Sequence, residues 1–248
     1  MSSTSTLPSR VSSIVSTMNM NTTSDNPSVF ASQNQPSYHR STADATDALC
    51  LPFVKAAAAA LAHDKLPYEA VKELLSGPTV AIYSKGQLVY SHFPVRAFMA
   101  VSSLAFGNLA VNPTQQKVQF RRPEPCAMKL TLASILDTLP NIKFPVGQTF
   151  IQNLRLYEAA LALGLTHNVR MYTNLLRDLV SARLLEYEEL DECLKRLKLE
   201  DPVLQNVVYT LAFYRRMGYI RDVKALDAYL QKHSELEAAL AAVDEDLS

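Results

Sequence analysis

One short interruption of an otherwise helical pattern limits the folds open to this chain. In TVAIY, residues 79–83, Val80 and Ile82 alternate with smaller or amphipathic residues, and a second run, LVYSHF, carries strong β formers after the segment 84–87. Alternation with a period of two is typical of half-buried strands, so the two runs predict a hairpin with a four-residue loop. Because most other segments show helical spacing, we expect the α+β class, with a small sheet surrounded by helices.

Helix signals lie on both sides of this hairpin. Residues 46–76 predict one or two helices, interrupted near Pro52 and Pro67, which end at Ser76-Gly77-Pro78. After a third short strand at 117–121, a helix is expected from Pro125 to Leu139, and Thr149 with Gln152 forms a capping-box pattern for the next. The chain therefore returns to helices after the third strand.

The segment 182–248 is expected to be an all-helical extension. Asp201-Pro202 pairs an N-cap residue with proline at the first helical position, and Gly218 suits the end of that helix. Asp191 with Lys195 and Glu192 with Arg196 have the i,i+4 spacing of exposed ion pairs.

The stretch VYSHFPVRAFMAVSSLAF, residues 89–106, could be a catalytic loop, a membrane segment or a packed part of an interaction domain. Its apolar run is interrupted by Ser102, Ser103 and Gly107, which leaves it too short to span a bilayer. Pro94 suits the start of a helix, and Ser102 or Ser103 could end one short helix or cap the next. We therefore favour the packed interpretation.

The composition indicates which kind of partner and which cellular compartment to expect. The 24 basic and 24 acidic residues cancel, so no overall field draws the chain to nucleic acid or to a membrane, and proteins are the expected partners. Three dispersed cysteines without a signal-peptide pattern favour reduced thiols inside the cell, in the cytoplasm or nucleus. A Ser/Thr/Asn-rich leader, 1–45, is expected to be disordered, with a cleaved mitochondrial leader as the alternative.

Few residues point to chemistry. The five histidines have no zinc-ligand spacing, and the six glycines form no phosphate-binding loop, so neither a metal nor a cofactor is expected. A hydrolase using Ser102, Ser103 or Cys126 with His92 stays open as a third class, although no G-x-S-x-G motif surrounds the serines. The expected class is not an enzyme.

Residues 77 to about 181 resemble a BTB/POZ domain of the divergent kind abundant in filamentous fungi. The stretch 77–83 matches the first strand of the family. His92 or Pro94 stands where the first helix of the family begins, and Phe98 stands where the family has a leucine. Ser102 and Phe106 lie near the position of the family's Ser-x-x-Phe motif. The strand 117–120, the helix 125–139 and an alanine-rich segment, 156–165, which ends in a Leu-Gly turn, follow in the family's order.

The resemblance implies an interaction module that homodimerises or docks a protein partner, in the role of an adaptor that brings substrates to a cullin ubiquitin ligase. It divides the chain into N-terminal helices (46–76), a BTB/POZ-like domain (77–181) and the helical extension (182–248). The candidate interface or core residues are His92, Pro94, Phe98, Val101 and Phe106.

Overall fold

The computed structural model describes residues 49–63, 66–139 and 141–246, and these residues form an α+β fold. The predicted leader, 1–45, lies outside the described residues. A mixed three-stranded sheet is built from β1 (Thr79–Ser84), β2 (Gln87–Pro94) and β3 (Lys117–Phe120). Strand β1 lies in the centre, antiparallel to β2 and parallel to β3. The predicted α+β class, with a small sheet among helices, is confirmed.

The loop of the predicted hairpin is shorter than expected. Both strands extend further than the sequence pattern indicated, so that Ser84 pairs with Gln87 and only Lys85 and Gly86 form the turn. Both turn residues have positive φ angles, 49° and 79°, as the tight turns that suit the twist of a hairpin require. Gly86 adopts this conformation without a steric penalty because it has no Cβ, and Lys85 is the polar residue that precedes it.

Among the described residues, two helices precede the sheet, and two follow the hairpin. Pro52 does not break the first helix, because it occupies the second position of α2, where a missing N–H leaves no helical hydrogen bond unmade. Pro94 closes β2 and lies at the N-cap of α4, so the helix begins at Val95, one residue later than predicted. The helices are α2 (Leu51–Leu61), α3 (Tyr68–Leu74), α4 (Val95–Val101) and α5 (Ser103–Val111).

Three longer helices follow β3: α6 (Pro125–Thr138), α7 (Phe150–Leu163) and α8 (Thr166–Ala182). The predicted capping box is confirmed, because the Thr149 hydroxyl accepts the N–H of Gln152 while the Gln152 side chain accepts the N–H of Thr149. At the other end of α7, Gly164 takes the left-handed conformation that ends helices.

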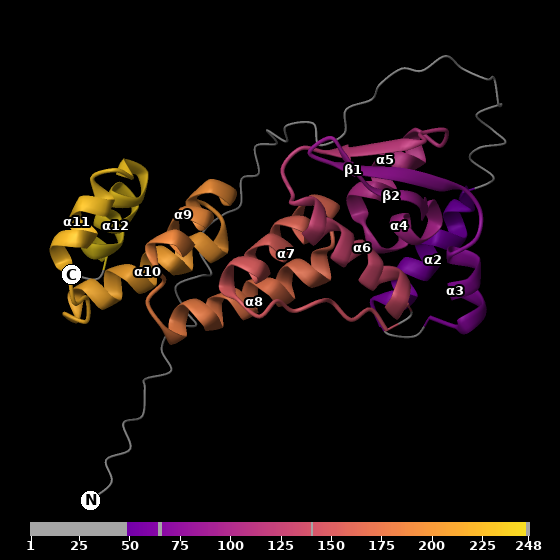
Figure 1. Ribbon diagram of the computed structural model, residues 1–248. Helices are drawn as coiled ribbons and strands as arrows, with labels where there is room; N and C mark the ends of the chain where they lie inside the picture. The colour runs from indigo at the N-terminus through magenta and orange to yellow at the C-terminus, as the bar shows by residue number, and fades with distance from the viewer. Residues whose placement is uncertain (1–48, 64–65, 140, 247–248) are drawn as a thin grey trace, which may run out of the picture.

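The remaining chain is helical, as predicted, in α9 (Tyr187–Arg196), α10 (Pro202–Arg216), α11 (Val223–Leu230) and α12 (Ser234–Asp246). Asp201 caps α10 by accepting the N–H of Val203. The sequence pattern did not single out α11, whose cap is Asp222. In Figure 1 these C-terminal helices extend from α7 and α8 to the end of the molecule opposite the hairpin.

Buried apolar side chains form two clusters whose limits differ from the predicted domain limits. The larger cluster runs from Leu49 to Val207, so it joins the N-terminal helices, the sheet, α9 and the first half of α10. The smaller one begins at Val208 and includes the buried residues of α11 and α12. The hydrophobic core therefore crosses the boundaries at 76 and 181, and the second core begins inside α10.

Candidate interaction site

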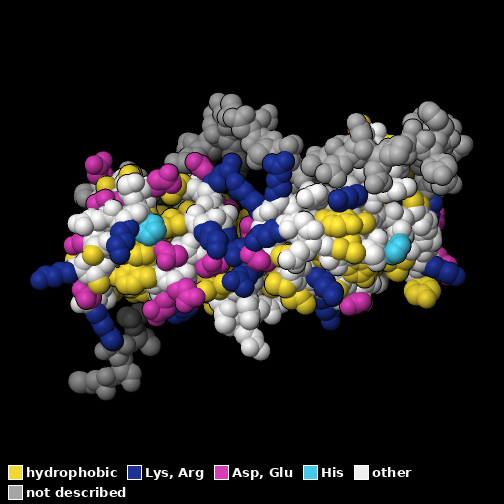
Figure 2. All heavy atoms as spheres, turned by 45° about the horizontal axis from the view of Figure 1, so that its top comes forward, with side chains coloured by type: hydrophobic (Ala, Val, Ile, Leu, Met, Phe, Trp, Pro, Cys, Tyr) yellow, Lys and Arg dark blue, Asp and Glu magenta, His cyan; other side chains and the backbone are white. Residues whose placement is uncertain are grey.

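Metal-ligand groups and membrane-spanning helices were sought among the described residues. Within them, no three His, Cys, Asp or Glu side chains are grouped so as to hold a metal ion. No described helix is long and apolar enough to cross a membrane. Basic and acidic side chains are interspersed on the face that Figure 2 shows, in agreement with the zero net charge.

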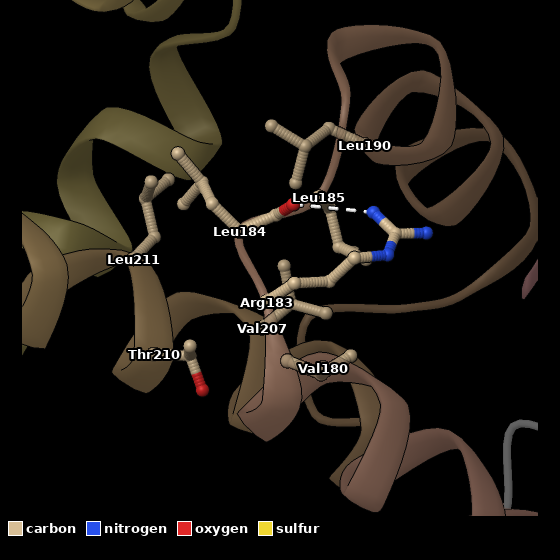
Figure 3. Close-up of a pocket in the computed structure, with 8 residues that line it drawn as sticks. All are labelled: Val180, Arg183, Leu184, Leu185, Leu190, Val207, Thr210 and Leu211. Atoms are coloured by element: carbon tan, nitrogen blue, oxygen red, sulfur yellow. Dashed lines mark hydrogen bonds between the residues drawn. The ribbon is translucent and has the colours of Figure 1, made fainter. Parts of the chain in front are cut away.

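Two hollows adjoin the C-terminal helices. The first, drawn in Figure 3, is lined by mostly apolar side chains where α8, α9 and α10 meet, and its volume of about 10 Å³ is room for a single water at most. The second is an open groove of about 960 Å³ between the α9–α10 connection and the start of α12. Leucines form its floor, and charges of both signs form its rim, including Lys198 and Glu200.

The five residues singled out in 89–106 differ in burial. Phe98 is fully buried, and its ring packs edge-on against that of Phe93 at 5.6 Å. Pro94, Val101 and Phe106 are half-buried, whereas His92 is exposed on β2. Phe98 therefore belongs to the core, and the other four remain accessible in part or in full.

The candidate hydrolase residues are held in separate contacts. The His92 ring Nδ1 lies 2.9 Å from the Ser91 hydroxyl oxygen. Ser102 is buried, and its hydroxyl donates to the carbonyl of Leu163 at the end of α7. Cys126 is exposed at the start of α6. These contacts give Ser102 a structural role.

Ser102 joins two helices at one point. Its side-chain oxygen accepts the N–H of Ala105 at 2.9 Å and so caps α5, as predicted for one of the two serines. Its hydroxyl hydrogen is donated to the carbonyl of Leu163 in α7. The adjoining Gly164 is needed here, because a Cβ on it would lie 2.7 Å from the Leu104 side chain. Ser102 thus fixes α5 against the end of α7.

Replacing Ser102 by alanine is expected to lower the free energy of unfolding by about 1–2 kcal/mol, because the cap is lost and the Leu163 carbonyl loses its donor. Thermal or urea unfolding of the full chain measures the change. Ser103→Ala is the matched control: Ser103 is exposed and its hydroxyl lies 3.4 Å from its acceptor, so its loss should have little effect. Equal effects at both positions would contradict this role for Ser102.

Helix α2 also covers part of the segment 89–106. It packs extensively on α4, and the Lys55 ammonium lies 5.7 Å from the centre of the Phe106 ring. A cation over an aromatic face is attracted by the ring's negative face. The N-terminal helices therefore cover part of the segment that the sequence singled out.

The most concentrated set of charges lies around Arg196, and it corrects a prediction. The sequence indicated an exposed Glu192–Arg196 pair, but the Arg196 side chain is only 4% exposed. Its guanidinium donates to Glu158 at 2.6 Å and to Glu192 at 2.7 Å, and it lies 3.5 Å from Glu124. Glu124 in turn pairs with Lys85 in the hairpin turn.

These contacts, which we call the Arg196 network, join four separate elements. Lys85 comes from the hairpin, Glu124 from the N-cap of α6, Glu158 from α7, and Glu192 with Arg196 from α9. Several carboxylates around one buried guanidinium compensate its charge where water is excluded. The network therefore ties the first helix of the extension to the α/β part of the molecule.

The carboxyl groups of the network respond differently to their surroundings. The hydrogen bond from Lys85, helped by the charge of Arg196, holds the pKa of Glu124 below its ordinary value. Burial acts to raise the pKa of Glu192, but the hydrogen bond and charge of Arg196 bring it below the ordinary value. Burial raises the pKa of Glu158 in spite of its bond to Arg196.

The other predicted pair, Asp191 with Lys195, is replaced by different partners. Lys195 lies 3.5 Å from Glu192, whereas Asp191 accepts the Tyr229 hydroxyl at 2.7 Å and lies 3.4 Å from His233. The ring of Tyr229 packs on those of Tyr187 and His233. Asp191 thus links α9 to the end of α11, a contact that spacing within one helix cannot reveal.

Comparison with family profiles, with curated proteins and with solved structures found no match to this chain.

Proposed function

We propose that the chain is a non-enzymatic adaptor, which homodimerises or docks a partner protein through a BTB/POZ-like part, in the cytoplasm or nucleus. The supporting observation is the order of the elements: a β2-β1-β3 sheet, the helix pair α4–α5 between β2 and β3, and then α6, α7 and α8. This is the order that the sequence resemblance led us to expect.

The accessible residues of 89–106 agree with such a role. His92 is exposed, while Pro94, Val101 and Phe106 each keep part of their surface open, so a partner could contact them without disturbing the core. Recruitment of a cullin-type ligase scaffold is a further part of this proposal, and it rests only on the resemblance of residues 77–181 to a BTB/POZ domain.

The first test is the mass of the full chain in solution, measured by sedimentation equilibrium over a concentration series. We expect twice the mass of one chain at micromolar concentration. His92→Glu should then raise the dimer dissociation constant about tenfold, because an added charge at an interface position costs binding energy. Val146→Glu, at an exposed position in the α6–α7 loop, is the control and should leave the dissociation constant unchanged.

A strict monomer over this series would contradict homodimerisation and leave docking of a different protein as the proposed role. A dimer that His92→Glu does not weaken would place His92 outside the interface.

A further inference from the structure

Basic side chains surround the Arg196 network on its solvent side. Lys85, Arg121 and Arg122 are exposed at the hairpin turn and in the link between β3 and α6. On the neighbouring helices, 39% of the Arg155 side chain and 70% of the Lys195 side chain are exposed. We call these five residues the basic rim.

The β3–α6 link fixes two arginines of the basic rim beside the hairpin turn. Lys85 donates its N–H to the carbonyl of Phe120 at 2.9 Å, and the Ser84 hydroxyl donates to the carbonyl of Pro123 at 2.5 Å. These bonds hold the backbone on both sides of Arg121 and Arg122. Among the described residues, neither guanidinium has an ion-pair partner. Their charges are therefore open to a ligand.

The carboxylates near the basic rim already have cations. Glu192 lies 3.8 Å from Arg155 and 3.5 Å from Lys195, in addition to its bond with Arg196. Glu158 bonds the same Arg196 guanidinium, and Glu124 pairs with Lys85. The side chains of these three glutamates are 10–27% exposed, so they lie deeper than the cations of the rim.

The local charge is consequently positive in a chain whose net charge is zero. The basic rim and the Arg196 network together contain six cations and three carboxylates, and the cations without a partner, Arg121 and Arg122, are on the outside. A surface with an excess of one charge favours an occupant of the opposite charge. The occupant should therefore carry acidic groups.

An acidic protein segment suits this surface better than a nucleic acid. Single-stranded nucleic acids stack their bases on open aromatic rings, but the Lys117 ammonium lies over the ring of the neighbouring Tyr83, 4.4 Å from its centre. The planar guanidinium groups of Arg121 and Arg122 can each bind a carboxylate through two parallel hydrogen bonds. In this chain, Asp244 near the C-terminus is already 3.8 Å from Arg215, so a second copy does not offer that carboxylate freely.

We propose that the basic rim docks an acidic segment of a partner protein, with carboxylates of the segment on Arg121 and Arg122 and others near Lys195. The inference rests on the proposed adaptor function, and it names the chemistry of one partner and a surface separate from the segment 89–106.

The test is binding of a fluorescently labelled oligoglutamate peptide to the full chain, measured by anisotropy, with an oligoglutamine peptide of the same length beside it. We expect saturable binding of oligoglutamate alone, and its affinity should fall with added salt. Arg121→Glu/Arg122→Glu should weaken the binding at least about tenfold, because two attractive contacts become repulsive. Arg170→Glu/Arg177→Glu is the matched control: it changes the net charge equally at two exposed arginines of α8 and should leave the affinity within about twofold of the native value.

Three results would overturn the inference: no saturable binding of oligoglutamate, equal weakening by both double variants, or tighter binding of a labelled single-stranded oligonucleotide that also depends on Arg121 and Arg122. Thermal unfolding of each variant checks that it is folded.

Sedimentation of the same samples separates this inference from homodimerisation. A monomer that binds oligoglutamate through Arg121 and Arg122 supports the inference and contradicts homodimerisation alone. A dimer that does not bind the peptide overturns the inference alone. A native dimer that Arg121→Glu/Arg122→Glu dissociates would show that a second copy covers the basic rim, and so would also overturn the inference.

Discussion

Replacing Arg196 by methionine is expected to lower the free energy of unfolding by about 3–5 kcal/mol, because Glu158 and Glu192 keep buried negative charge without their cation. Both carboxylates lie within 2.7 Å of the guanidinium, whose side chain is 4% exposed. Chemical unfolding at pH 7 measures the change. Lys195→Met is the matched control on the same helix, and a change of no more than about 0.5 kcal/mol is expected there, since Lys195 is 70% exposed.

The pH dependence of the same variant gives an independent check. The lowered pKa values of Glu124 and Glu192 stabilise the fold above the unfolded-state values near 4.5, and this stability is lost as the pH falls through the lower folded-state values. Glu158, whose pKa is raised, acts in the opposite sense. The difference between the native chain and Arg196→Met should therefore shrink in acid, where Arg196 loses its charged partners. A difference that is small at pH 7, or that grows in acid, would contradict a buried network.

Replacing Phe98 by alanine is expected to cost about 3–5 kcal/mol of unfolding free energy, because the change leaves a cavity in a close-packed core. The ring is fully buried and packs against that of Phe93. The loss should appear in urea unfolding of the full chain. Variants at Phe98 are therefore unsuitable for mapping a binding surface.

Phe213→Ala is the matched control for Phe98→Ala, because the same side chain is removed from a position that is 41% exposed. A loss of about 1 kcal/mol or less is expected there, since much of the ring already faces solvent. Comparable losses at the two positions would contradict either the burial of Phe98 or the exposure of Phe213.

Local signals predicted most of the secondary structure. The alternation of Val80 and Ile82 predicted β1, and Thr149 with Gln152 predicted the start of α7. These signals involve residues a few positions apart, so the chain itself displays them. The predicted length of the hairpin turn was wrong, because the ends of strands depend on cross-strand pairing, which the sequence of one strand does not show.

The candidate surfaces were harder to predict from the sequence. Phe98, Val101 and Phe106 were all candidate interface or core residues, yet only Phe98 is fully buried, because burial depends on which elements pack over each side chain. The exposed aromatic side chains of α10, Tyr209 and Phe213, were not singled out from the sequence, because exposure is a property of the folded chain.

The sequence by itself determined the fold class, the principal helix caps and the central hairpin, because periodicity and capping act within a few residues. The tertiary structure alone decided that Arg196 is buried and that the core crosses the predicted domain limits. These properties depend on which segments meet: Glu124, Glu158 and Arg196 come from three elements far apart in the chain. Burial, and with it the strength of an ion pair, is a property of the assembled fold.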